Sequence, residues 1–331
     1  MKKTLTILAL VIMLVSSFAF SGSAAPNYNW KIQHIRPVGT AIDTDVNWLV
    51  DQLKERSDGR IVIDIFPASQ LGDYTVVQER VGLGDIEMQL ASLGTAMDKG
   101  LMIQSLPYIA SNWEEARELY SSGSKLMNVV GDLLEKQNLK LISGWPCYFG
   151  GIVLTKEPPS PGDPNVPKNI KIRVPPQKSF ELNGESLGYL ATPIAWSEAF
   201  TSLQTGIVDG AIGSGAEGYY ANFRDLAKYF LPLNDHFEMW YFYMNLDLWN
   251  SLSADDQKLI QEVSSELEQN RFAIAEEDEK ANIQKLADYG IEIITFTDEE
   301  LAGFAVKARE YVWPKIRDDI GGEVMDKVLG Q

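Results

Sequence analysis

The sequence predicts an α/β protein of two domains, and three observations lead to this prediction. Apolar runs typical of strands alternate with helical stretches through most of the chain. The chain has 331 residues, more than one typical domain holds. One uninterrupted helical stretch, residues 253–290, is also too long for a single small domain.

The strands are expected at apolar, β-branched runs, and the helices lie between them. The expected strands are residues 61–66, 139–142, 170–174, 191–195 and 291–294, and the helical stretches include residues 45–57 and 113–137. Because strands alternating with helices favour parallel pairing, mostly parallel sheets are expected. The stretch 158–167 has five prolines and is expected to be a loop just after the chain crosses between domains.

The long helix has clear start and stop signals. Ser253 is a good N-cap, and Asp256 occupies the capping-box position three residues later. No Pro or Gly follows until Gly290, a natural C-cap. An unbroken helix here would be about 54 Å long, against about 30 Å for a small domain. We therefore expect it to run from one domain to the other, unless it is kinked. A coiled coil is the alternative, although the apolar heptads end at Leu267.

The N-terminus is typical of an exported protein. Lys2 and Lys3 precede an apolar run at residues 5–20, and small residues follow at 21–25. This pattern predicts a signal peptide over residues 1–25, cleaved near Ala24 or Ala25, and hence a soluble periplasmic protein. A membrane anchor is the alternative, but the run is short for a spanning helix.

The charge and the scarcity of reactive residues exclude several classes of function. A net charge of −17 argues against nucleic acid and against an anionic membrane surface. Cys147 is the single cysteine, so no disulfide can form within the chain. With two histidines and no HExxH, CxxC, GxSxG or phosphate-binding loop motif, we expect no enzyme activity, no metal site and no cofactor.

Arg173 is the first candidate binding residue. It lies on the expected strand 170–174, which Pro175 ends directly after it. Open α/β sheets bind ligands at the carboxyl ends of their strands. The planar guanidinium suits a carboxylate, which it can bind with two hydrogen bonds. An ordinary ion pair with a neighbouring Asp or Glu is the alternative.

Aromatic residues supply further candidates. Trp196 stands before a helix that is expected to begin at Ser197, and a helix N-terminus favours anions. Other rings crowd loops and strand ends, and could form an aromatic box for a flat ligand or belong to the core. These rings are Phe149, Tyr219, Tyr220, Trp240, Tyr241, Phe242 and Tyr243.

An ordered set of motifs resembles the DctP-type solute-binding proteins of tripartite ATP-independent periplasmic (TRAP) transporters. The similar segments are residues 57–72, 81–88, 170–175, 193–200, 203–210 and 234–236. The resemblance implies a type II-like periplasmic binding protein fold, in which hinge strands and a long helix are shared by both domains. It places domain I at residues 26–148 plus about 239–275, and domain II at 149–238 plus about 276–331.

The resemblance also implies a ligand site in the cleft between the domains. The family's clamping arginine falls on Arg173, and its aromatic residue beside the ligand falls on Trp196. The loop 33–39 and the turn 71–74 usually face the cleft. The ligand-binding residues expected on these grounds are Arg173, Trp196, Phe149, His34, Asp73, Tyr74, Ser92, Gly213, Trp240 and Tyr241.

Two departures from the family pattern narrow the expected ligand. No second arginine stands near Phe149, where sialic acid binders of the family have one, and residues 211–213 read Ala-Ile-Gly where many members have Gln-Glu-Asn. We therefore expect a monocarboxylate with an apolar or aromatic body. The expected partners are this acid and the membrane subunits of a TRAP transporter, with the protein itself a monomer. A ligand-presenting protein for a membrane sensor, or a periplasmic enzyme on the same scaffold, are the alternatives.

Overall fold

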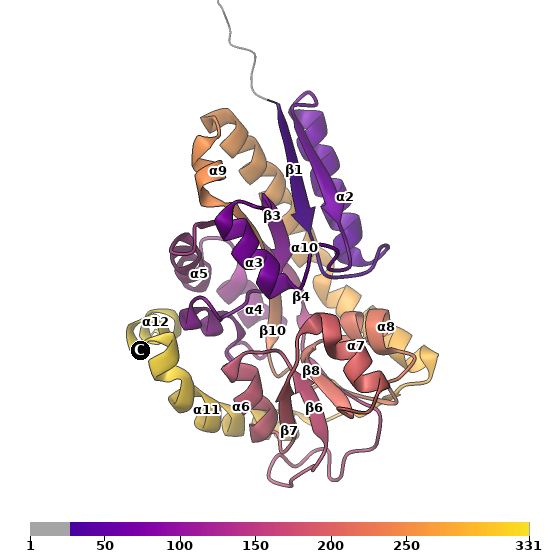
Figure 1. Cartoon of the computed structure of the whole chain (residues 1–331). Helices are drawn as coiled ribbons and strands as arrows, with labels where there is room; N and C mark the ends of the chain where they lie inside the picture. The colour runs from indigo at the N-terminus through magenta and orange to yellow at the C-terminus, as the bar shows by residue number, and fades with distance from the viewer. Residues whose placement is uncertain (1–26, 331) are drawn as a thin grey trace, which may run out of the picture.

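The computed structural model describes residues 27–330, which form two domains that meet along a shared face (Figure 1). Each domain is built on its own sheet, so the predicted two-domain α/β fold is confirmed. The signal peptide expected at residues 1–25 lies outside the described residues. Between residues 27 and 330, no helix combines the length and the apolar character needed to cross a membrane.

The first domain contains a five-stranded sheet. Its strand order is β2 (Ile61–Phe66), β1 (Tyr28–Gln33), β3 (Met88–Ala91), β10 (Phe237–Asn245) and β4 (Leu139–Phe149). The first three strands are parallel, whereas β10 runs antiparallel to both β3 and β4. The expected strand at 139–142 is therefore much longer than predicted, because β4 continues toward the second domain.

The second domain contains a six-stranded sheet. Its strand order is β11 (Glu292–Ile293), β9 (Tyr229–Leu231), β5 (Gly151–Leu154), β8 (Gly210–Ser214), β6 (Lys171–Val174) and β7 (Leu190–Pro193). Strand β6 is parallel to β7 and β8, but β5 is antiparallel to β8 and β9. Mostly parallel pairing was therefore only partly correct, because the strands next to the crossings pair antiparallel.

Two strand crossings connect the domains. Strand β4 passes into β5 at Gly150, and β9 passes into β10 through residues 232–236. The two crossings lie side by side, since the Gly150 N–H donates to the His236 carbonyl at 2.8 Å. A Cβ at Gly150 would lie 2.0 Å from Cε1 of His236, so only glycine fits this close approach. The domain boundaries expected near residues 149 and 238 stay predictions.

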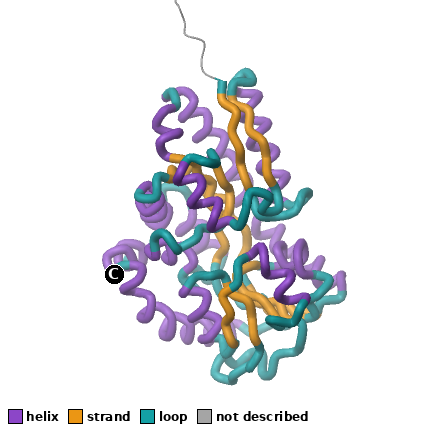
Figure 2. The backbone as a smooth tube through the Cα atoms, viewed as in Figure 1, coloured by secondary structure: helices purple, strands orange, loops and turns teal. Residues whose placement is uncertain are grey.

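The third connection is the long helix α10 (Ala254–Tyr289), which is one unbroken helix as predicted. The Ser253 hydroxyl accepts the backbone N–H of Asp256 at 3.1 Å, and Gly290 ends the helix with a φ of +102°. Helix α10 contacts α2 (Ala41–Arg56) and β4 in the first domain, and α8 (Ala216–Phe223) and β11 in the second. Helix α10 therefore runs from the first domain to the second (Figure 1 and Figure 2).

The remaining helices flank the two sheets. In the first domain they are α3 (Tyr74–Leu83), η1 (Lys99–Ser105), α4 (Trp113–Tyr120), α5 (Lys125–Glu135) and α9 (Leu246–Ser251), and in the second α6 (Lys178–Ser186) and α7 (Trp196–Gln204). The helical stretch expected at 113–137 is thus two helices. A turn separates them, with Gly123 at a φ of +85° and Ser124 capping α5.

The C-terminal helices return toward the first domain. Helix α11 (Asp298–Ile320) packs on α6 and η1, and α12 (Gly322–Leu329) packs on α5 and η1. Residues 276–331 were expected to belong to domain II as a block. The contacts of α12 are instead with first-domain helices, because its buried Met325 and Val328 join the apolar cluster beside α5.

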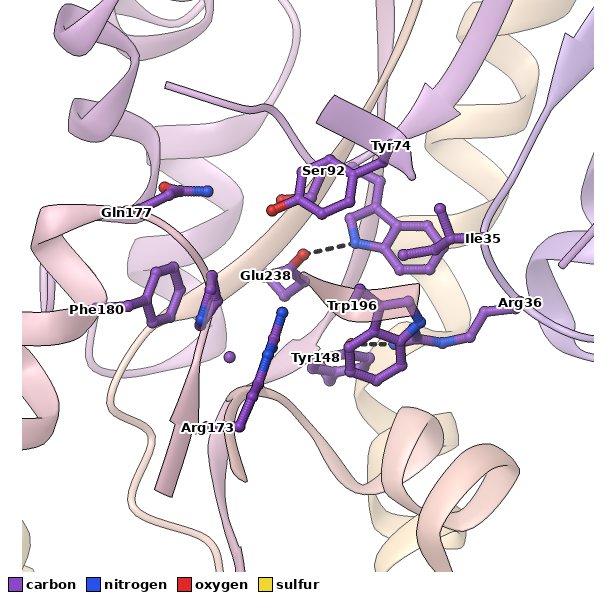
Figure 3. A pocket seen from close by; sticks show the side chains of 13 residues that line it. Ile35, Arg36, Tyr74, Ser92, Tyr148, Arg173, Gln177, Phe180, Trp196 and Glu238 are labelled. Atoms are coloured by element: carbon purple, nitrogen blue, oxygen red, sulfur yellow. Dashed lines mark hydrogen bonds between the residues drawn. The ribbon is translucent and has the colours of Figure 1, made fainter. Parts of the chain in front are cut away.

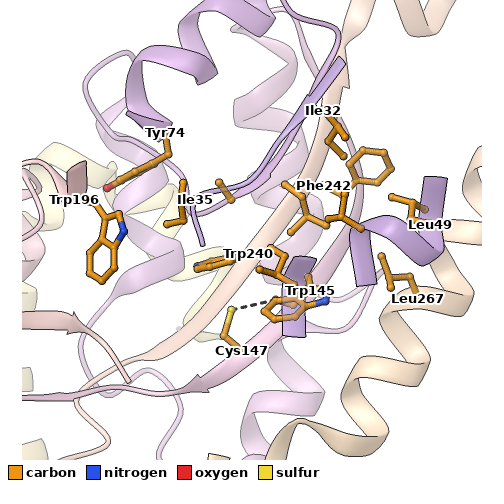
Figure 4. Close-up of a cluster of buried hydrophobic side chains, with 14 of the residues drawn as sticks. Ile32, Ile35, Leu49, Tyr74, Trp145, Cys147, Trp196, Trp240, Phe242 and Leu267 are labelled. Atoms are coloured by element: carbon orange, nitrogen blue, oxygen red, sulfur yellow. Dashed lines mark hydrogen bonds between the residues drawn. The ribbon is translucent and has the colours of Figure 1, made fainter. Parts of the chain in front are cut away.

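The apolar core of the first domain reaches the boundary between the domains. Figure 4 shows this cluster, in which Trp145 and Trp240 stack with ring centroids 5.5 Å apart. Trp196, from the second domain, belongs to the same buried cluster. Packing alone therefore brings aromatic rings of both domains to one place.

Candidate functional site

A cavity lies between the two domains where their buried residues meet (Figure 3). It is lined by Ile35, Arg36, Tyr74, Ser92, Tyr148, Arg173, Pro175, Gln177, Phe180, Trp196, Gly213, Glu238 and Trp240. The space that the centre of a water molecule can reach within it is only about 20 Å³. One water needs about 10–15 Å³, so the residues that line the cavity must shift to admit a larger ligand.

Arg173 extends from β6 into this cavity. Its Nε donates to the Ile194 carbonyl at 2.8 Å and its Nη1 to the Ile212 carbonyl at 3.3 Å. None of the ion pairs among residues 27–330 involves Arg173, although its side chain is buried. Burial lowers the pKa of this guanidinium, and the nearby Tyr74, Tyr219, Asp73 and Glu238 offset only part of the lost hydration. Its other N–H donors are thus available to an anion.

Arg36 is a second buried arginine at the cavity, and it comes from the first domain. Its Nε pairs with Glu217 at 2.9 Å, and its Nη2 donates to Tyr148 Oη at 2.7 Å and Ser214 Oγ at 3.1 Å. Glu217 and Ser214 belong to the second domain. Arg36 therefore bonds the two domains together, and its own charge is already neutralised.

Two tryptophans enclose the Arg36 guanidinium. Its carbon lies 4.6 Å from the Trp196 ring centroid and 4.8 Å from that of Trp240, within the range of cation–π attraction. Gly218 permits this position, because a Cβ there would lie 2.3 Å from Nη2 of Arg36. One face of each ring is thus covered by protein.

Glu238 adds a negative charge to the cavity. Its Oε1 accepts the indole N–H of Trp240 at 2.6 Å, and its Oε2 lies 3.3 Å from Nε2 of His236. On its other side, Nδ1 of His236 is 2.9 Å from Asp235. Burial alone would lower the pKa of His236, but Asp235 and Glu238 together raise it to about 10. His236 is therefore protonated at neutral pH.

Neutral hydrogen-bonding groups complete the lining. Burial raises the pKa of Tyr74 to about 12, so its phenol keeps its proton. Ser92 lies near it in Figure 3, and Gln177 is a further lining residue. Gln177 also donates to the Leu93 carbonyl at 3.0 Å, which is another hydrogen bond between the domains.

The structure brings six of the ten expected residues to the cavity lining and places four elsewhere. Arg173, Trp196, Tyr74, Ser92, Gly213 and Trp240 line it. Phe149 packs edge-on against Trp113 and Phe237, and Tyr241 is in the same first-domain cluster, because both point to the opposite face of the sheet from Trp240. The His34 ring is fully buried beside Asp43.

Asp73 acts at the entrance of the cleft instead of lining the cavity. Its carboxylate caps α3 by accepting the Thr75 N–H at 3.1 Å. The same carboxylate accepts the backbone N–H and hydroxyl of Ser197 at 3.4 and 3.3 Å, across the cleft. This helix was expected to begin at Ser197, but α7 begins one residue earlier, at Trp196, and has no side-chain cap. Asp73 binds this helix end from the other domain.

Arg36, Tyr148, Gln177, Phe180 and Glu238 were missed as candidates. Arg36 lies within the loop 33–39 that was expected to face the cleft, so a basic residue in that loop was an available signal. Of the other four, Tyr148 lies on β4 and Glu238 on β10, while Gln177 and Phe180 lie at the start of α6. Among residues 27–330 there is also no cluster of His, Cys, Asp and Glu arranged to hold a metal ion.

The pKa values of His236 and His34 are shifted in opposite directions, so we expect the two residues to make stability depend on pH in opposite ways. The folded pKa of His236 is raised to about 10, so its stabilisation is complete below its unfolded pKa near 6.5 and is lost as the pH rises to 10. The folded pKa of His34 is lowered by burial, so its contribution is lost as the pH falls below about 6.5.

We expect the free energy of unfolding to fall by up to about 1.4 kcal/mol per pH unit between pH 7 and 10 because of His236. Denaturant unfolding followed by tryptophan fluorescence measures this slope. His236→Asn should flatten it, whereas His34→Asn, the matched control, should leave it unchanged. An alkaline slope that persists in His236→Asn would contradict the assignment.

The fold and the site define a two-domain binding protein with a buried cavity between its domains that Arg36, Arg173 and Glu238 line. The model of the DctP family, described as bacterial extracellular solute-binding protein, family 7, matches residues 32–317. The chain belongs to this family, the solute-binding proteins of TRAP transporters, and the predicted resemblance is confirmed. Proteins of this family are periplasmic.

Individual relatives and solved structures agree with this membership. The chain is 28% identical over 268 residues to the sialic acid-binding periplasmic protein SiaP of Vibrio cholerae, covering 78% of this chain and 79% of the relative. It is 26% identical to a solute-binding protein of Roseobacter denitrificans, covering 93% of both. A TRAP periplasmic solute-binding protein of Desulfovibrio salexigens, solved with orotic acid, superposes with a TM-score of 0.83 at 21% identity, over 91% of this chain and 96% of that one.

Proposed function

We propose that this protein captures a small organic acid in the cavity between its domains and delivers it to the membrane subunits of a TRAP transporter. The carrying observation is Arg173, a buried guanidinium whose hydrogen bonds go to two carbonyls and not to a carboxylate. A buried cation of this kind needs an anion to offset its lost hydration. The carboxylate of the acid fills this role.

The related proteins support an acid as the ligand. Two relatives are named for binding sialic acid and C4-dicarboxylates. Structures with similar folds hold orotic acid, succinate or galactonate. Each of these compounds is an organic acid, although their bodies differ widely.

The arrangement of charge supports a single carboxylate on the ligand. Arg36, the other arginine of the cavity, is already paired with Glu217, so Arg173 is left to bind an anion. Phe180, Trp196 and Ile35 provide apolar surface for the rest of the molecule. We therefore retain a monocarboxylate with an apolar or aromatic body. The proposed contacts are Arg173, Trp196, Tyr74, Ser92, Gly213 and Trp240.

The contacts between the domains support capture by closure. Arg36, Asp73 and Gln177 each bond to a group of the opposite domain, and these bonds exist only while the cleft is shut. A ligand that touches both walls stabilises the closed form by its differential affinity for it. The transporter would recognise that closed form.

The direct test is to identify the acid. Protein purified from the periplasm is denatured, and the released compound is identified by mass spectrometry. Calorimetric titration of the refolded protein with that compound should give micromolar or tighter binding. Recovery of an unchanged carboxylic acid supports capture without catalysis. We also propose that the protein works as a monomer. If titration with the recovered compound and with a broad panel of organic acids gives no binding, the proposal fails. Binding of the closed protein to a sensor domain, and not to TRAP membrane subunits, would favour the receptor-coupled alternative.

A further inference from the structure

Glu238 is a buried carboxylate that faces the same cavity as Arg173. Its exposed fraction is 8%, and Figure 3 shows it opposite the Arg173 guanidinium. Trp240 donates to one oxygen, and His236 is beside the other. A carboxylate has about four lone-pair positions, so Glu238 can accept further hydrogen bonds from a ligand.

Summed over the cavity and the groups next to it, the charges balance without a ligand, although no carboxylate among the described residues forms an ion pair with Arg173. The cations are Arg36, Arg173 and the protonated His236, and the anions are Glu217, Asp235 and Glu238. Asp73, at the entrance, adds a further negative charge. A plain carboxylate would therefore bring an uncompensated negative charge into a closed cavity, which is costly. A ligand that also carries a positive charge would not.

We infer that the acid bound here is amphoteric: its carboxylate pairs with Arg173, and a protonated nitrogen on its body donates to Glu238. This inference rests on the proposed function and names its substrate class. The ligand would be an amino acid or a similar zwitterion with an apolar body, bound with its two charges toward opposite walls. Glu238 would then set specificity, because an acid without the nitrogen leaves this carboxylate without a donor.

Matched pairs of compounds isolate the contribution of the nitrogen. Piperidine-4-carboxylate and cyclohexanecarboxylate have nearly the same shape, as do 4-(aminomethyl)benzoate and 4-ethylbenzoate. A library of such pairs is screened by the shift in Tm and ranked by calorimetric Kd. We expect the nitrogen-containing members that bind to do so about 10- to 100-fold more tightly than their partners.

Two variants assign the effect to one side chain. Glu238→Gln keeps the shape but removes the charge, and should abolish or reverse the preference. Glu268→Gln is the matched control, since Glu268 is a buried carboxylate outside the cavity that binds Ser122 and Gly144. It should lower Tm without changing the ratio of the two Kd values. Circular dichroism verifies that both variants are folded.

The outcomes separate the two proposals. If monocarboxylates without nitrogen bind as tightly as their nitrogen-containing partners, the inference is wrong and the proposed function stands. The same holds if Glu238→Gln still binds the nitrogen-containing compounds more tightly. If the wild-type protein binds neither kind of monocarboxylate, nor the compound recovered from it, nor any acid of the broad panel, the proposed function fails and this inference fails with it. If Glu238→Gln removes the preference for the nitrogen-containing compounds and Glu268→Gln does not, the result supports both the inference and the proposed function.

Discussion

Replacing Arg173 with Gln is expected to weaken binding of the acid by more than about 100-fold. A hydrogen bond to a charged group contributes about 1.5–3 kcal/mol, and the guanidinium has donors for two such bonds. Each 1.4 kcal/mol corresponds to a factor of ten in Kd. Calorimetric titration with the acid recovered from the protein measures the loss.

The same substitution should have little effect on folding. Arg173 has no carboxylate partner among the described residues, so its removal breaks no ion pair. The Tm of Arg173→Gln should therefore stay within a few degrees of wild type. Arg173→Lys keeps the charge but loses the planar fork, and should bind with intermediate affinity. Wild-type affinity in Arg173→Gln would show that Arg173 does not bind the acid.

Replacing Arg36 with Met is expected to keep the cleft open. In the closed form the change would leave Glu217 without its guanidinium partner, and breaking a buried ion pair costs about 3–5 kcal/mol. Opening the cleft returns Glu217 to water, so the domains separate instead of unfolding. At saturating acid, small-angle X-ray scattering should give a larger radius of gyration for the variant than for wild type.

Two further variants test this explanation. Arg36→Met combined with Glu217→Gln removes the stranded charge and should restore part of the closure. Arg56→Met is the control, because its ion pair with Glu266 is exposed to solvent and is expected to contribute little to stability. If Arg36→Met closes as fully as wild type, the ion pair does not hold the domains together.

Local signals in the sequence were sufficient for much of the fold. The long helix is a clear case, because Ser253 and Gly290 define its ends and no residue between them interrupts it. The strand at 61–66 was also predicted with its observed bounds. Such elements depend on neighbouring residues, which a single sequence displays directly. The return of α12 to the first domain was not predicted, since it depends on contacts with residues about 200 positions earlier.

The residues of the site also fall into two groups, those that local sequence signals predicted and those that they did not. Arg173 and Trp196 were found because they stand at a strand end and a helix start, and motifs around them resemble a family. Glu238 was missed, and Phe149 and Tyr241 were chosen, because the alternation of a fully buried strand does not reveal which face is the cavity. Both faces of β10 are covered by apolar residues, so hydrophobicity gives no sign of direction.

By itself, the sequence determined the class of protein, the long shared helix and one basic residue suited to an acid. Only the tertiary structure decided that Arg36 is neutralised by Glu217, that Trp196 and Trp240 enclose it, and that Glu238 faces Arg173. The physical reason is that each of these charges comes from a different part of the chain. Their balance, which governs the ligand that a closed cavity accepts, exists only once the two domains are brought together.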